Sequence, residues 1–201
     1  MQDQRAAFAV SANVKWEADV GMAISDETWK KCCAHMRALS PNYRLRLINF
    51  TFLQRLYYTP WGLCAMGLQT DASCEKCHAP DDDFFHLAWQ CGEVHDFWLE
   101  VAHVIGEMTG LKLALSPVLA LLGSVDPMPP AQQKLVGMLL LLVMRRVAIC
   151  WGRGRCAWVT VWLRDAAYCR EQLETFWELA PEGSRPRDIW VPLREYLETA
   201  Y

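Results

Sequence analysis

The sequence predicts a mainly α-helical fold: an irregular helical domain that contains a small zinc-binding segment of the CCHC type. Three observations support this class. Apolar residues recur at intervals of three and four in several stretches, which is the period of an amphipathic helix. The alternating pattern of β-strands is nearly absent. Cysteine and histidine are concentrated between residues 74 and 91, at a spacing suited to one metal ion.

The composition is typical of a folded protein with free thiols. The chain has 201 residues, of which 53% are hydrophobic and 21% charged, and this allows a sizeable core. Its formal net charge of −3 argues against a general polyanion binder. Nine cysteines without a recognisable export signal favour metal binding over disulfide bonds. We therefore expect a nuclear or cytoplasmic protein.

The first helices are predicted from residues that start a helix and from apolar spacing. Residues 1–24 show neither signal and are expected to be loosely ordered. Ser25, followed by two acidic residues, indicates a helix start, and this helix is expected to continue to about residue 38. A second helix is expected from Tyr43, and residues 58–62 interrupt it.

Four longer helices are expected after these, at about residues 86–108, 131–151, 157–178 and 187–199. The proline-rich turn at residues 126–130 is the best candidate for a domain boundary. We therefore divide the remaining chain into a helical subdomain at 25–125, with the zinc site at 74–91, and a C-terminal helical subdomain at 126–201. The most apolar run is too short to cross a bilayer, so no membrane partner is expected.

The strongest chemical signal is the spacing C-x2-C-x8-H-x4-C. It is formed by Cys74, Cys77, His86 and Cys91. Two cysteines three residues apart can bind one ion at a tight turn, and the later histidine and cysteine can complete a tetrahedron. All four positions would then be filled by protein. This pattern is typical of a structural rather than a catalytic zinc ion.

Two neighbouring histidines and a redox function are weaker interpretations. His78 adjoins Cys77 and would have to point away from the ion, and His95 follows only after Cys91 has completed the set. A redox motif at the first cysteine pair would need a preceding strand, which residues 69–73 do not form.

The second signal is a basic stretch with interleaved aromatic residues. Between residues 28 and 70 there are six basic residues and no acidic one. Such residues can neutralise phosphates while aromatic rings stack on unpaired bases. The alternative is a solvated helix face beside core aromatic residues. The nucleic-acid contacts that we predict are Lys30, Lys31, Arg37, Arg44, Arg46, Arg55, Tyr57 and Tyr58.

Motifs of the common enzyme classes are not found in the sequence. It contains no glycine-rich phosphate loop, no Gly-x-Ser-x-Gly elbow and no His-Glu-x-x-His helix. We therefore do not expect a free-standing enzyme.

The order of these motifs resembles the C-terminal segment of the second open-reading-frame protein of vertebrate LINE-type non-LTR retrotransposons. The similarity begins at residues 15–21 and includes Leu-Tyr-Tyr-Thr-Pro at residues 56–60. His86-Leu-Ala-Trp-Gln-Cys91, followed by Phe97-Trp98, is similar to the family's pattern of His, apolar, Trp, Glu, Cys and then Phe-Trp. The similarity continues to Ile189-Trp190, and the order and spacing of its motifs carry it.

The resemblance implies a particular function. Proteins of this family have an endonuclease, a central reverse transcriptase and a cysteine-rich tail associated with RNA binding, and only the tail corresponds to this chain. It implies a non-catalytic RNA-binding module that holds structural Zn²⁺ and supports template binding in a ribonucleoprotein. Its partners would be single-stranded or structured element RNA and the rest of the retrotransposon polyprotein. The alternative is a structural or protein-interaction domain, a decayed or host-retained fragment that binds no nucleic acid.

Overall fold

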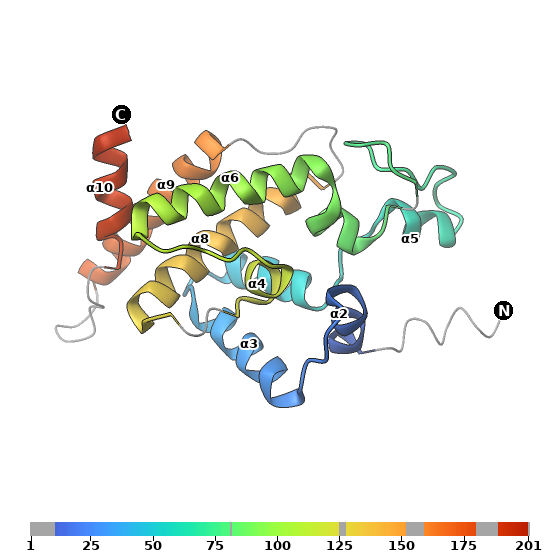
Figure 1. The fold of residues 1–201 in the computed structure, drawn as a ribbon, viewed down its shortest axis with the longest axis horizontal. Coiled ribbons are helices and arrows are strands. Elements are labelled where there is room, and N and C mark those ends of the chain that lie inside the picture. Colours follow the sequence, from blue (N-terminus) through green and yellow to red (C-terminus); the bar gives the residue numbers. More distant parts are fainter. Residues whose placement is uncertain (1–10, 81, 125–127, 152–158, 180–188, 201) are drawn as a thin grey trace.

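The computed structural model describes residues 11–80, 82–124, 128–151, 159–179 and 189–200, and these residues form helices and no strand (Figure 1). The predicted mainly α-helical class is confirmed. In chain order the elements are α2 (Ala12–Val20), α3 (Asp26–Ala38), α4 (Tyr43–Leu53), α5 (Pro60–Ala65), the π-helical turn η1 (His86–Gln90), α6 (Gly92–Thr109), α7 (Pro117–Leu122), α8 (Pro130–Ile149), α9 (Val159–Glu178) and α10 (Val191–Ala200).

Helix α8 lies at the centre of the core. Every residue from Leu135 to Met144 is buried, so this helix is apolar on all sides rather than along one stripe. It packs against α4, α6 and α9, which surround it in Figure 1. The buried Trp162 of α9 donates a hydrogen bond from Nε1 to the Leu139 carbonyl at 3.1 Å.

Several helix ends follow from local sequence, and the helix start at Ser25 is the one that the sequence predicts. Ser25 precedes α3, and its hydroxyl accepts a hydrogen bond from the Thr28 amide at 3.1 Å. Gly110 ends α6 with φ at 69°, in the left-handed region where glycine has no steric penalty. Ser116 caps α7 through a hydrogen bond from the Leu119 amide. These caps satisfy backbone groups that a helix end leaves without partners.

Part of the amino-terminal segment, which the sequence predicts to be loosely ordered, forms a helix. Residues 12–20 form α2, so the prediction of a loosely ordered segment at 1–24 is wrong for this part, and residues 1–10 lie outside the described residues. Trp16 is fully buried and donates a hydrogen bond to the Leu53 carbonyl at 3.0 Å. The segment has little helical amphipathicity of its own, and one buried tryptophan holds it in place.

The two subdomains share a single hydrophobic core. Helices α4 and α6, from the expected 25–125 part, pack directly against α8 from the 126–201 part. The expected division therefore does not separate two cores. Residues 125–127 of the proline-rich boundary, and the predicted helix starts at 157 and 187, lie outside the described residues.

Replacing Leu141 by alanine should strongly destabilise the fold. This leucine of α8 is fully buried, so its loss leaves a cavity, and we expect the free energy of unfolding to fall by about 2–5 kcal/mol. The measurement is urea denaturation followed by circular dichroism. The control is Leu99→Ala on α6, where the side chain is 48% exposed and a change within about 0.5 kcal/mol is expected. Equal losses in both variants would contradict this account of the core.

Candidate metal centre

The four predicted ligand residues come together at one point. One ligand atom from each of Cys74, Cys77, His86 and Cys91 lies within 4.8 Å of the others, which suits a single ion. The Cys74 and Cys91 sulfur atoms are 3.9 Å apart, and Cys77 Sγ lies 3.2 Å from His86 Nε2. Cys74 and Cys91 are buried, His86 is half-buried and Cys77 is exposed. The group can therefore hold a metal ion near the surface.

A tight turn positions the first two cysteines. The Cys74 amide donates to the Ala79 carbonyl at 2.9 Å, and the His78 amide donates to the Cys74 carbonyl at 2.8 Å. His78 has φ at 58°, a left-handed conformation that few residues other than glycine adopt. These bonds close the chain around Cys77 and place both sulfur atoms on one side.

A π-helical turn positions the other two ligands. The Cys91 amide donates to the His86 carbonyl at 2.8 Å, which spans five residues. In an α-helix, residues three or four apart are neighbours, whereas residues five apart point in different directions. The wider turn brings residue 91 next to residue 86. The predicted helix over 86–108 is therefore η1 followed by α6, and the π-helical turn explains the x4 spacing.

Aromatic residues surround the inner side of the centre. Phe84 and Phe85 are buried, and Trp98 is fully buried with its Nε1 donating to the Ala88 carbonyl at 3.0 Å. His95 contacts the half-buried Trp89, with ring centroids 5.1 Å apart. Neither His95 nor the exposed His78 belongs to the ligand group, as the sequence predicts.

Burial sets the protonation of the inner thiols. It raises the pKa of Cys74, and it raises that of Cys91 to about 12. A metal ion binds thiolates, so binding must displace these protons, and the affinity falls on acidification. A thiol with a raised pKa is a poor nucleophile. The cluster is therefore suited to metal binding and not to thiol chemistry.

Arg55, one of the predicted nucleic-acid contacts, is packed against other side chains instead of facing solvent. Its guanidinium forms an ion pair with Asp19 at 2.5 Å and lies over the rings of Trp16 and Phe84, 5.1 and 4.9 Å from their centroids. Its side chain is only 11% exposed. Arg55 thus joins α2 to the aromatic residues beside the metal centre, and we remove it from the nucleic-acid contacts.

Tyr57 and Tyr58, both predicted nucleic-acid contacts, differ in how far their side chains are exposed to solvent. Tyr57 is half-buried, and its ring centroid lies 5.2 Å from that of Phe52 and 5.1 Å from that of Trp151. Tyr57 therefore belongs to the core. Tyr58 is 70% exposed, while its carbonyl accepts a hydrogen bond from Trp151 Nε1 at 2.7 Å. Of the two tyrosines, Tyr58 alone presents its ring to solvent.

The remaining predicted contacts are exposed. They are Lys30, Lys31, Arg37, Arg44 and Arg46. Lys31 forms an exposed ion pair with Glu27 at 2.9 Å, of the kind that contributes little. Arg44 lies over the ring of Tyr43, 5.8 Å from its centroid. Within the described residues, Arg37, Arg44 and Arg46 form no ion pair.

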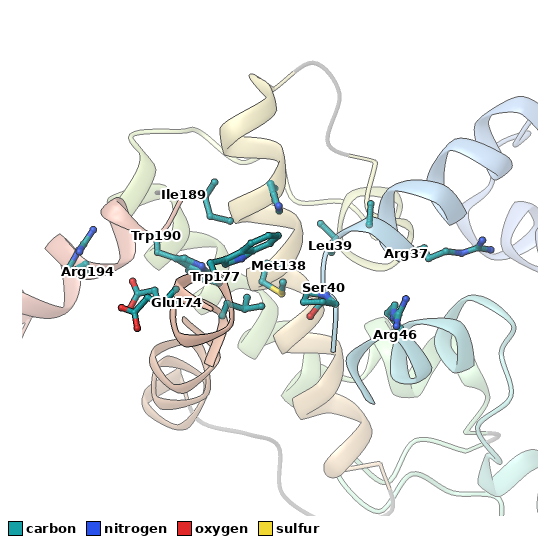
Figure 2. Close-up of a pocket in the computed structure, with 15 residues that line it drawn as sticks. Arg37, Leu39, Ser40, Arg46, Met138, Glu174, Trp177, Ile189, Trp190 and Arg194 are labelled. Carbon is teal, nitrogen blue, oxygen red and sulfur yellow. The ribbon is translucent and has the colours of Figure 1, made fainter. Parts of the chain in front are cut away.

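A pocket of about 660 Å³ lies beside these arginines (Figure 2). Figure 2 shows Arg37 and Arg46 on one side, and Trp177 and Trp190 on the other. The full lining includes Lys134, Glu174, Glu178 and Arg194. A second pocket of about 560 Å³ is lined by Arg44, Tyr168 and Phe176, and both pockets include Ser40 and Pro41.

Sequence reasoning missed the C-terminal side of these pockets. Lys134 and Trp177 are far from the basic stretch in the chain, and Lys134 Nζ lies 5.9 Å from the Trp177 ring centroid. An isolated lysine and a tryptophan on an amphipathic helix give no signal of a shared site. Only the packing of α3 and α4 near α8 and α9 brings them beside Arg46.

Comparison with known proteins does not assign the chain. No protein-family model and no curated protein sequence matches it. Among the residues that the structure describes, no helix combines the length and apolar character needed to cross a membrane.

Replacing Cys91 by serine should abolish metal retention. The variant lacks a buried ligand, and we expect the bound zinc to fall from one per chain to none after dialysis against a weak chelator, with loss of helical signal. The measurement is metal content per chain together with circular dichroism. Cys64→Ser is the control, because Cys64 is half-buried outside the ligand group and should retain zinc. Full zinc content in Cys91→Ser would disprove the ligand assignment.

Replacing Arg55 by glutamine should lower stability. The change leaves the Asp19 carboxylate without its cation and removes the contacts with two aromatic rings, so we expect a loss of roughly 2 kcal/mol. Urea denaturation measures it. An unchanged midpoint, together with weaker nucleic-acid binding, would instead place Arg55 on a binding surface.

Proposed function

We propose that this chain is a non-catalytic RNA-binding module whose fold is held by a structural zinc ion. The main observation in support of this proposal is that Arg44 and Arg46 are exposed together with Tyr43 and Phe50 on helix α4. This is the combination of charge and aromatic surface that binds single strands. The resemblance to the tail of LINE-type reverse transcriptase proteins supports the same function.

Zinc is the ion that best fits the donor set. Three sulfur atoms and one imidazole nitrogen are soft and borderline ligands, and zinc binds such sets in tetrahedral geometry. With four protein ligands, no position remains for a water molecule. The ion would therefore link the cysteine turn to η1 and α6 and would take no part in catalysis.

The outer face of α4 provides the contacts. Tyr43, Leu47 and Phe50 are 65%, 59% and 54% exposed, and Arg46 is exposed beside them. Positions 43, 46, 47 and 50 have the spacing of one helical face. Rings that would normally be buried are thus held at the surface beside a cation. The rings can stack on bases while the arginine neutralises phosphate.

The pocket next to α4 extends this surface toward the C-terminal helices. Arg37 and Arg46 line it together with Lys134, and Trp177 adds an aromatic ring. Glu174 and Glu178 also line it, so binding of phosphate is favoured mainly on the α3–α4 side, near the arginines. A strand that crosses α4 would therefore place phosphates near the arginines and a base near Trp177.

The preferred partner is unpaired RNA. Stacking on tyrosine, phenylalanine or tryptophan requires bases that are free of a duplex, as in loops and single strands. In a retrotransposon setting the module would support template binding in a nuclear or cytoplasmic ribonucleoprotein, beside the rest of the polyprotein. The competing function is protein interaction, since the exposed Leu47 also suits an apolar partner surface.

Replacing Arg46 by glutamine should weaken RNA binding and reduce its salt dependence. Loss of one phosphate contact lowers the slope of log affinity against log salt concentration by about 0.7 for a single strand. The measurement is fluorescence anisotropy with a labelled single-stranded RNA over a salt series. The control is Lys112→Gln, an exposed charge between α6 and α7, which should leave the slope unchanged.

Two outcomes would overturn parts of this proposal. If the unaltered protein binds no RNA at any salt concentration, RNA binding is wrong and protein interaction becomes the better account. If RNA binds and both variants behave alike, the contact surface is elsewhere on the molecule.

A further inference from the structure

Asp82 is a buried acid beside the predicted metal ligands. Its exposed fraction is 0%, neither carboxylate oxygen has an N–H or O–H donor among the described residues, and its polar neighbours are His86, Lys76 and the Cys74 thiol. Burying an acid without a partner is costly, and such groups in folded proteins are normally paired or bound to a metal. A metal ion held by the neighbouring ligands would give the Asp82 carboxylate a further positively charged neighbour.

The carboxylate lies on the metal side of His86. Asp82 Oδ1 is 3.8 Å from His86 Nε2, the same nitrogen that lies 3.2 Å from Cys77 Sγ. A carboxylate that only orients a histidine ligand bonds the ring nitrogen that faces away from the ion. Asp82 instead lies next to the metal-facing nitrogen. This is where a further donor oxygen would be.

The backbone holds Asp82 in this place from two sides. Its amide donates to the Ala72 carbonyl at 2.7 Å, and its carbonyl accepts from the Trp61 amide at 3.2 Å. The next residue, Asp83, accepts a hydrogen bond from the His86 amide at 2.7 Å. Asp82 and Asp83 are therefore held in place by these bonds, and the Asp82 carboxylate is already buried beside His86.

We propose that Asp82 is a reserve ligand that completes the metal shell when Cys77 is not bound. A tetrahedral zinc ion has four places, which the four residues of the ligand group can fill, and Asp82 Oδ1 lies outside this group at 3.8 Å from His86 Nε2. Among the three cysteine ligands Cys77 is the exposed one, and so the one most open to loss. A shell of Cys74, His86, Cys91 and Asp82 is also closed.

Charge favours this exchange. Replacing one thiolate by one carboxylate leaves the net charge of the shell unchanged, so the buried centre gains no additional charge. With all three thiolates bound, Asp82 would be an extra anion, and it then stays outside the shell. Burial raises the pKa of Asp82, while His86 and Lys76 nearby oppose that rise.

The test compares single and double substitutions in the full chain. Zinc affinity is measured by competition with a chromogenic chelator for Cys77→Ser, Asp82→Asn and the double variant, with circular dichroism of each zinc-loaded sample. We expect each single variant to retain one zinc per chain. The double variant should lose at least about tenfold more affinity than the product of the two single losses.

Matched controls separate this role from a general loss of structure. Asp71→Asn makes the same chemical change at an exposed position in the same segment, and combined with Cys77→Ser it should show only the product of the single losses. The cobalt spectrum of Cys77→Ser, which folds if the proposal holds, provides a second measurement. It should show fewer thiolate-to-metal charge-transfer transitions with ligand-field bands of a four-coordinate ion.

Three results would overturn the proposal. If Asp82 replaces the thiolate, Cys77→Ser retains zinc whereas Cys91→Ser loses it, so equal loss in the two variants contradicts the proposal. A double variant that matches the product shows that water, not Asp82, fills the place. A cobalt spectrum of Cys77→Ser without four-coordinate bands also contradicts it. None of these results bears on RNA binding, which the salt series tests separately.

Discussion

Convergence of three thiols and one imidazole is the constraint on which the central part of this structure depends. Among the described residues between α5 and α6, the regular backbone structure consists of a tight turn at the first two cysteines and the π-helical turn η1. A metal ion held by the four ligand residues would join the two turns beside buried aromatic residues. Because the ligand atoms meet only when both turns are formed, metal binding would stabilise this local fold.

The same segment is connected to α2 and to the end of α8 by aromatic contacts. Phe84 contacts Trp16 of α2 and Trp151 after α8, with ring centroids 5.7 and 5.2 Å apart. Arg55 lies over two of these rings and pairs with Asp19. Loss of the metal ion should therefore weaken the packing of α2 as well as that of the metal segment, because both belong to the same hydrophobic core. The proposed RNA surface on α4 lies outside this network, which separates the structural role of the centre from the proposed binding role.

Much of the fold and of the centre was predictable, for identifiable reasons. Helices α3, α6, α8 and α9 have strong apolar periodicity or clear caps, and local sequence decides both features. The four ligands were found because tetrahedral coordination requires particular residue types at short spacing. Helix α2 was missed because a single buried tryptophan stabilises it. The proline-rich boundary near residue 126 rests on a turn signal, and such a signal does not report which helices share a core.

The sequence by itself determined the helical class, the ligand set and the excess of basic residues before the metal segment, because each depends on residue type and short-range spacing. Only the tertiary structure decided which basic residues face solvent. Arg55 and Tyr57 belong by sequence to the same stretch as Arg46, yet packing buries the first two and exposes the third. Tertiary structure also placed Asp82 beside His86 and Lys134 beside Trp177, because such contacts depend on how distant helices and turns meet.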